Sequence, residues 1–185
     1  MTQRGQWIFV LGIVGVLIGG LVVGMMLTPA LAPLGVQSPA PAFEARDVRT
    51  GDVIRLADYD DEVLLVNIWA TWCGPCEQEM PAIQHLQDSL GPHGFRVVAV
   101  SVDNATEDVL AWVEERGFTF TVLHDPSGRI ERDYQTTGVP ESFVLDRDRI
   151  IVKKVIGAIE WDHPTQVAQI ERLLGGNDAE TDESD

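Results

Sequence analysis

Residues 64–83 read LLVNIWATWCGPCEQEMPAI, and they contain the strongest structural pattern of the chain. The run Val63–Trp69 is almost entirely apolar, which is typical of a strand buried on both faces of a sheet. Apolar residues then recur at helical spacing from Met80 to Leu90. A buried strand that passes directly into a helix predicts an α/β sandwich, and both cysteines of the chain lie at the junction.

Strands and helices alternate through the rest of the domain. The predicted strands occupy residues 43–46, 53–56, 96–102, 119–123, 142–146 and 150–156, and the predicted helices occupy 73–90, 106–116, 130–134 and 163–174. The first two strands flank Thr50-Gly51-Asp52 and form an N-terminal hairpin, and the last two form a second hairpin. Together these elements predict a mixed central sheet flanked by helices.

Composition excludes several classes of function. The 185 residues include 13 basic and 29 acidic ones, for a net charge of −16. A nucleic-acid partner is therefore not expected, because binding a phosphate backbone requires clustered Lys and Arg. Two cysteines are too few for a disulfide scaffold or a four-cysteine zinc site. The four histidines show no ligand spacing, so no metal site is predicted.

An apolar segment precedes the domain. Trp7 to Leu27 are 21 consecutive residues without a charge, and a helix of that length spans about 31 Å, close to the thickness of a hydrocarbon core. Arg4 lies before this segment, and the next basic residue is Arg46. The charge asymmetry predicts that residues 1–6 are cytoplasmic, that 7–27 anchor the chain in the membrane and that the remainder is translocated.

A cleaved signal peptide is the alternative, since Ala30-Leu31-Ala32 resembles a cleavage site. The apolar core exceeds the length usual for signal peptides, and Pro33 would follow the cut, so we favour an uncleaved anchor. Residues 28–42 contain four prolines and predict an extended linker. The domain is expected over 43–176, and the acidic tail 177–185 is expected to be disordered.

Trp72-Cys73-Gly74-Pro75-Cys76 places both thiols at the start of a helix. Unpaired N–H groups and the helix dipole favour a thiolate at Cys73, and Cys76, one turn further on, can close a disulfide. Such a pair is suited to thiol–disulfide exchange. A purely structural disulfide is disfavoured because so short a loop removes little chain entropy, and a lone CxxC offers a metal only two ligands.

The stretch 64–83 resembles the active-site segment of the thioredoxin superfamily. More narrowly, WCxxCxxEMP, with Glu79 and Pro81, is similar to the membrane-anchored TlpA/ResA/CcmG (DsbE)-type thiol-disulfide oxidoreductases. The sequence TGVPESF at 137–143 resembles the cis-proline loop of this branch. The resemblance covers roughly residues 38–175 and implies a thioredoxin-like fold.

The resemblance also implies roles for individual residues. Cys73 is expected to be the exposed nucleophile and Cys76 the buried resolving thiol. Glu79 is expected to be the third catalytic residue, as the proton acceptor. Expected substrate contacts come from the motif and from the cis-proline loop, where the backbone of Val139 would pair with a bound substrate strand; they are Trp72, Gly74, Pro75, Val139, Pro140 and Glu141.

Two carboxylates carry open alternatives. Glu79 could instead be a solvated helix residue, and Glu141 is expected to face the site because it adjoins Pro140. Many thioredoxins keep a buried Asp six residues before the first cysteine, but this chain has Asn67 there. Asn67 cannot titrate, which makes Glu79 the better candidate for proton transfer.

The resemblance implies a reductase that uses only the Cys73–Cys76 pair and no cofactor. Its partners would be oxidised exported proteins such as apocytochrome c and a transmembrane thiol donor, with the catalytic domain on the extracytoplasmic side of the cell membrane. A general disulfide reductase or isomerase and a redox-inert module that binds cysteine peptides remain alternatives. A peroxiredoxin is disfavoured because it needs Thr three residues before its cysteine, whereas Thr71 lies two before Cys73.

Overall fold

The computed structural model describes residues 3–31 and 33–175, in two units, Met1–Leu34 and Gly35–Asp185. In the first unit, α1 (Gln3–Leu31) is a 29-residue helix that contains the predicted apolar segment. Counting only residues whose side chains are described, no helix is both long enough and apolar enough to cross a membrane. Residues 1–2 and the predicted tail 177–185 lie outside the described part of the chain.

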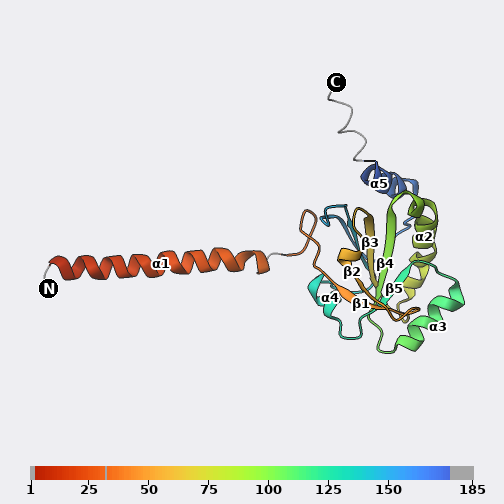
Figure 1. Cartoon of the computed structure of the whole chain (residues 1–185), viewed down its shortest axis with the longest axis horizontal. Helices are drawn as coiled ribbons and strands as arrows, with labels where there is room; N and C mark the ends of the chain where they lie inside the picture. Colours follow the sequence, from red (N-terminus) through yellow and green to blue (C-terminus); the bar gives the residue numbers. More distant parts are fainter. Residues whose placement is uncertain (1–2, 32, 176–185) are drawn as a thin grey trace, which may run out of the picture. The chain divides into compact units, whose positions relative to one another are not determined.

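The second unit is built on a seven-stranded mixed sheet in the order β2-β1-β5-β4-β3-β6-β7 (Figure 1). The strands β3, β4 and β5 are parallel, and the other neighbours are antiparallel. The strands are β1 (Glu44–Asp47), β2 (Val53–Arg55), β3 (Val63–Trp69), β4 (Phe95–Ser101), β5 (Thr121–His124), β6 (Glu141–Leu145) and β7 (Ile151–Ile156). The predicted hairpins β1–β2 and β6–β7 are both confirmed.

Helices cover both faces of the sheet (Figure 1). They are α2 (Gly74–Leu90), α3 (Thr106–Arg116), α4 (Arg129–Asp133) and α5 (Pro164–Leu174), with short 3₁₀ turns at Leu56–Asp58 and Gly91–His93. Every element predicted in the domain is present, with its bounds shifted by at most two residues. Gly117 ends α3 as predicted, in a left-handed conformation with φ of 68°.

The strand β3 is the centre of the core, and all seven of its residues are buried. Because side chains alternate along a strand, the two faces of β3 belong to different layers. Leu65 and Trp69 pack with Met80 and other residues of α2 in one hydrophobic cluster. On the opposite face of the sheet, the rings of Tyr134 and Phe143 lie 5.0 Å apart. This core holds the end of β3, and therefore the cysteine motif, in a fixed place.

Part of the predicted linker belongs to the domain. Gln37 N donates to Ile151 O at 2.8 Å, Ile151 N to Ser38 O at 2.9 Å, and Ala40 N to Arg149 O at 2.8 Å. The segment thereby satisfies backbone groups at the edge of the sheet that would otherwise be unpaired. The prediction that the linker extends to residue 42 is therefore wrong, since the chain joins the sheet from Gln37 onward.

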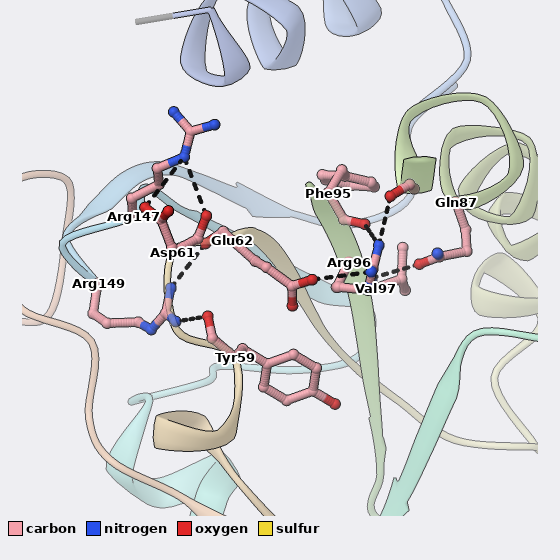
Figure 2. Close-up of polar contacts among 10 residues, drawn as sticks. Tyr59, Asp61, Glu62, Gln87, Phe95, Arg96, Val97, Arg147 and Arg149 are labelled. Carbon is pink, nitrogen blue, oxygen red and sulfur yellow. Dashed lines mark hydrogen bonds and ion pairs between the residues drawn. The ribbon is translucent and has the colours of Figure 1, made fainter. Parts of the chain in front are cut away.

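At the end of the sheet remote from the cysteine motif, three arginines bond to the segment before β3 (Figure 2). Arg149 donates to the carbonyl oxygens of Glu62 and Tyr59, while Arg147 donates to that of Asp61. The Arg96 guanidinium lies 3.0 Å from the Glu62 carboxylate. These side chains are engaged within the protein, so they do not form a free basic surface.

Candidate active site

The cysteine motif forms the N-terminus of α2. Cys73 is the N-cap residue, with φ of −91° and ψ of 100°, and its sulfur accepts a hydrogen bond from Cys76 N at 3.2 Å. Pro75 lies in the first turn, where its missing N–H leaves no helical hydrogen bond unmade. The sulfurs of Cys73 and Cys76 are joined at 2.06 Å, with their Cα atoms 5.2 Å apart. The structure therefore holds the pair in its oxidised form.

The two sulfurs differ in access. Cys76 is fully buried, whereas Cys73 is 5% exposed, so the predicted exposed nucleophile has only a small opening in the disulfide state. Trp72, by contrast, is 71% exposed. Gly74 and Pro75 are also exposed. A reactant can therefore reach the pair only from the side of Cys73.

A cleft of about 390 Å³ has Trp72 in its wall. Its other lining residues are Val102, Pro126, Ser127, Gly128, Glu131, Arg132, Gly138 and Val139. The Val139–Pro140 peptide bond is cis, as the resemblance implied. The structure thus brings Trp72 and Val139, two predicted substrate contacts, to one cleft. Sequence reasoning missed the stretch 126–132, because nothing in its composition marks it as part of a site.

Glu79 lies inside the protein and not on a solvated face of α2. Its residue is 2% exposed, so the alternative of a solvated helix carboxylate is wrong. Asn67 Nδ2 donates to Oε1 at 2.8 Å, and Ile159 N donates to Oε2 at 3.3 Å. Burial raises the pKa of Glu79 to about 7, and hydrogen bonding from Asn67, Ile159 and the Trp161 side chain opposes that rise. Glu79 can therefore take up or release a proton near neutral pH.

Asn67 connects Glu79 to the neighbouring strand. It stands opposite Ser142 in the β3–β6 pairing, and its Nδ2 also donates to Ser142 Oγ at 2.9 Å. All three residues are buried. A chain of polar side chains thus runs from β6 through β3 to α2, where Glu79 lies one helical turn after Cys76.

Glu141 does not face this chain. In the sheet Glu141 is paired with Ile68, so it lies on the opposite face from Asn67 and Ser142. Its carboxylate accepts a hydrogen bond from Thr137 N at 2.9 Å and lies 3.0 Å from Lys154 Nζ. Glu141 was expected to face the site as a substrate contact, and its carboxylate is instead held by Thr137 and Lys154. The side chain instead ties the start of the cis-proline loop to β7.

Asp103 was missed by sequence reasoning. It is 6% exposed, and its carboxylate accepts hydrogen bonds from Thr71 N at 2.9 Å, Thr71 Oγ1 at 2.6 Å and Ser101 Oγ at 2.8 Å. Thr71 belongs to the loop that leads into Trp72 and Cys73. A carboxylate two residues past a buried parallel strand was the available signal, because such ends meet at one edge of the sheet. Within the described residues, no group of three or more His, Cys, Asp or Glu side chains could hold a metal ion.

Comparison with known proteins places this geometry in a family. The model of the AhpC/TSA family matches residues 36–154, which is more than half of the chain. The chain belongs to the AhpC/TSA family. Among its relatives is the thiol:disulfide interchange protein DsbE of Allochromatium vinosum, 33% identical over 181 residues and covering 95% of this chain and 98% of the relative. The thiol-disulfide oxidoreductase ResA of Oceanobacillus iheyensis is 31% identical over 130 residues, covering 69% and 68%.

Solved structures of thiol:disulfide interchange proteins and of a thioredoxin domain have a similar fold. A crystal structure assigned as DsbE from Chlorobium tepidum has a TM-score of 0.72 and 34% identity, covering 77% of this chain and 99% of that one. The thioredoxin domain of a Bacteroides vulgatus oxidoreductase, at 24% identity and a TM-score of 0.68, matches in fold. The predicted thioredoxin-like fold is confirmed. With its cysteine pair at disulfide distance, this AhpC/TSA-family protein is a thiol-disulfide oxidoreductase.

Proposed function

We propose that the protein reduces disulfides in exported proteins on the extracytoplasmic side of the cell membrane, with apocytochrome c as its substrate. The observation that carries the proposal is the placement of the two cysteines. Cys73 caps α2 at the open side of the motif, and Cys76 is sealed beneath it. One sulfur is placed to attack a foreign disulfide and the other to release the product.

The reduced pair would act in two steps. The Cys73 thiolate, held by the helix N-terminus and the Cys76 N–H, attacks one substrate sulfur and expels the other, forming a mixed disulfide. Cys76 then gives its proton to Glu79 and attacks the Cys73 sulfur, which expels the second substrate thiolate. The substrate disulfide gains two electrons from the cysteine pair, one proton that Cys76 passes through Glu79 and a second proton from solvent, and the protein is left with the bond seen between Cys73 and Cys76.

The substrate would bind as an extended strand. Trp72 and Val139 share one cleft, so a segment that pairs with the Val139 backbone would pass the exposed indole and reach Cys73. Apocytochrome c fits this scheme, because its CxxCH motif can close to a disulfide that must be opened before heme is attached. The resemblance to the TlpA/ResA/CcmG branch supports this choice of substrate.

Location and electron supply complete the proposal. The 21 uncharged residues Trp7–Leu27 lie within α1, and the length of this apolar run supports an uncleaved anchor. A reductase in an oxidising compartment needs electrons from across the membrane, so a transmembrane thiol protein would regenerate the dithiol. The dithiol is proposed to be the sole redox group, without a cofactor.

Thiol trapping in intact membranes tests the direction of electron flow. We expect alkylation to find Cys73 and Cys76 mostly reduced in growing cells, and oxidised when the transmembrane donor is absent. A pair that stays fully oxidised in normal cells would contradict a reductase and favour an oxidase or isomerase.

Substrate capture tests the acceptor. In Cys76→Ser the mixed disulfide cannot be resolved, so we expect a covalent adduct with an oxidised CxxCH peptide that thiol reductants cleave. Cys73→Ser is the matched control and should form no adduct. If Cys73→Ser retained full reductase activity, a catalytic role of this thiol would be excluded. A peptide with a scrambled sequence that reacts equally fast would favour a general reductase over one dedicated to apocytochrome c.

A further inference from the structure

The side chain of Asn67 is hydrogen-bonded through only one of its two ends. Its Nδ2 donates to Glu79 Oε1 at 2.8 Å and to Ser142 Oγ at 2.9 Å. Its Oδ1 is buried and has no hydrogen-bond partner among the described residues. Buried amide oxygens are normally paired, so an unpaired one next to a group that titrates near neutral pH requires an explanation.

This arrangement does not suit a Glu79 that is protonated at Oε1, the oxygen that faces the Asn67 amide. An ionised carboxylate accepts the Asn67 N–H, but a protonated Oε1 would point its own hydrogen at that donor. Rotating the amide by half a turn about its last side-chain bond would exchange the two ends. Oδ1 would then accept from the Glu79 O–H and from the Ser142 hydroxyl, which can donate as well as accept.

We propose that Asn67 is a positioning residue for the exchange reaction, an amide that reverses its orientation when the Glu79 carboxyl gains or loses a proton. The inference rests on the proposed function in one respect, namely that the proton comes from Cys76. Ser142 is also required, because its hydroxyl can accept from the Asn67 amide nitrogen in one orientation and donate to the Asn67 oxygen in the other. Glu79 thereby keeps its hydrogen bond to β3 throughout the cycle.

During resolution of the mixed disulfide, one proton moves to Glu79 and one disulfide bond replaces another. Before resolution, Glu79 is ionised and accepts from Asn67 Nδ2, and Cys76 carries its thiol proton. As Cys76 attacks the Cys73 sulfur, its proton passes to Glu79, the substrate–Cys73 bond breaks and the Cys73–Cys76 bond forms. Asn67 then turns Oδ1 toward the new O–H. When Glu79 releases the proton to the departing thiolate or to water, the amide turns back.

Asn67 makes the shortest hydrogen bond to the Glu79 carboxyl, and no charged group of the described part of the chain lies beside it. The groups that act on the carboxyl are the Asn67 amide from β3 and, from the loop before α5, the Ile159 N–H and the Trp161 indole. Cys76 lies one turn earlier on the same helix. In the described residues, no Lys, Arg or His lies within ion-pair distance of Glu79. The charged pair on the same loop, Asp162 with His85 at 3.2 Å, is exposed. No fixed charge therefore holds Glu79 in one protonation state.

Nuclear magnetic resonance on the oxidised full chain in detergent micelles tests the reversal without any variant. The Glu79 carboxyl carbon reports its titration, and contacts of the Asn67 side-chain protons report the orientation of the amide. We expect these contacts to shift from Glu79 and Ser142 to other neighbours as the pH falls from 9 to 5, with the same midpoint as Glu79. An amide that keeps its contacts while Glu79 titrates would overturn the proposal.

Variants test its consequence for the reaction. Asn67→Leu keeps the volume but removes the donor, so the Glu79 midpoint should rise by about one pH unit and product release at pH 7 should slow about tenfold. Asn67→Asp should split the titration into two steps, because two carboxyls at hydrogen-bond distance share one proton. Ser142→Ala leaves the donor to Glu79 in place and should slow release about threefold at most.

The outcomes separate this inference from the proposed function. Asn67→Leu with an unchanged Glu79 midpoint overturns the role of Asn67 whatever the activity. A wild-type protein that reduces no disulfide overturns the proposed function, whereas the measurement on the oxidised protein still decides whether Asn67 reverses. If Asn67→Leu does not fold, the wild-type measurement decides the matter alone.

Discussion

Two buried carboxylates flank the cysteine motif, and their surroundings differ. Asp103 accepts three hydrogen bonds from two neighbours, Thr71 and Ser101, at 2.6 to 2.9 Å. Glu79 accepts one from Asn67 at 2.8 Å and a longer one from Ile159 at 3.3 Å, and burial raises its pKa to about 7. Burial is similar in both, at 6% and 2% exposure.

Hydrogen-bond donors, more than depth of burial, determine what each of these two carboxylates can do. Each donor lowers the free energy of the charged form, and burial raises it. Asp103 has its oxygens committed to Thr71 and Ser101, which makes it a clamp on the loop before Cys73. Glu79 has fewer and weaker donors, which leaves its proton free to move.

The largest effect is expected for Glu79→Gln. Without a proton acceptor behind Cys76, release of product from the mixed disulfide at pH 8 should slow by about 10²- to 10³-fold. The rate should also lose the rise with pH that centres near 7 in the wild type. Single-turnover kinetics from pH 5 to 9 measure both. Asp88→Asn, an exposed carboxylate on the same helix, is the control, and an unchanged profile for Glu79→Gln would remove Glu79 from the mechanism.

The same substitution should change how stability depends on pH. The pKa of Glu79 is raised from 4.5 to about 7 in the folded state, so the unfolded chain ionises first as the pH rises. Stability is therefore lost between pH 4.5 and about 7 and stays low above that range, by up to about 3 kcal/mol. Denaturant unfolding at pH 4 and pH 8 should show this loss in the wild type and not in Glu79→Gln. Equal losses in both proteins would show that the carboxyl titrates normally.

The fold could be predicted from the sequence because local patterns and the core agree. The apolar run of β3, the spacing of α2 and the glycine after α3 each determine one element, and the burial of β3 confirms them. The dithiol was predictable for the same reason, since Cys73 and Cys76 lie on one helical turn.

The remainder of the site depends on contacts between distant segments. Asn67 meets Ser142 only because β3 pairs with β6 in one register, and a shift of one residue would have brought Glu141 there instead. Asp103 reaches Thr71 across 32 positions in the chain. The burial of Glu79 requires Ile159, which lies 80 positions away. Such pairings are set by packing of the whole sheet, and one sequence read alone does not contain them.

A smaller effect is expected when the clamp is altered. Asp103→Asn keeps the shape but loses acceptors for Thr71 and Ser101, so stability should fall by about 2 kcal/mol and the rate of attack by Cys73 about tenfold. The alkylation rate of Cys73 against pH should show a shifted midpoint, which a purely structural loss would not cause. Asp146→Asn, which neutralises the carboxylate that accepts from Ile150 N at the far hairpin, is the control. If both variants shift the midpoint equally, Asp103 has no special link to the loop.

The smallest effect isolates one bond of the clamp. Thr71→Val removes the hydroxyl that donates to Asp103 at 2.6 Å but leaves the Thr71 N–H bond at 2.9 Å in place. Loss of one hydrogen bond to a charged group should weaken folding by about 1.5 kcal/mol, and attack by Cys73 should slow about threefold. Thr71→Ser keeps the hydroxyl and should restore both quantities. Product release depends on Glu79, so the pH midpoint of the release rate, near 7, should be the same in the wild type, Thr71→Val and Thr71→Ser. A midpoint that moves in Thr71→Val would mean that Asp103 and Glu79 are coupled through the cysteine motif and do not act separately.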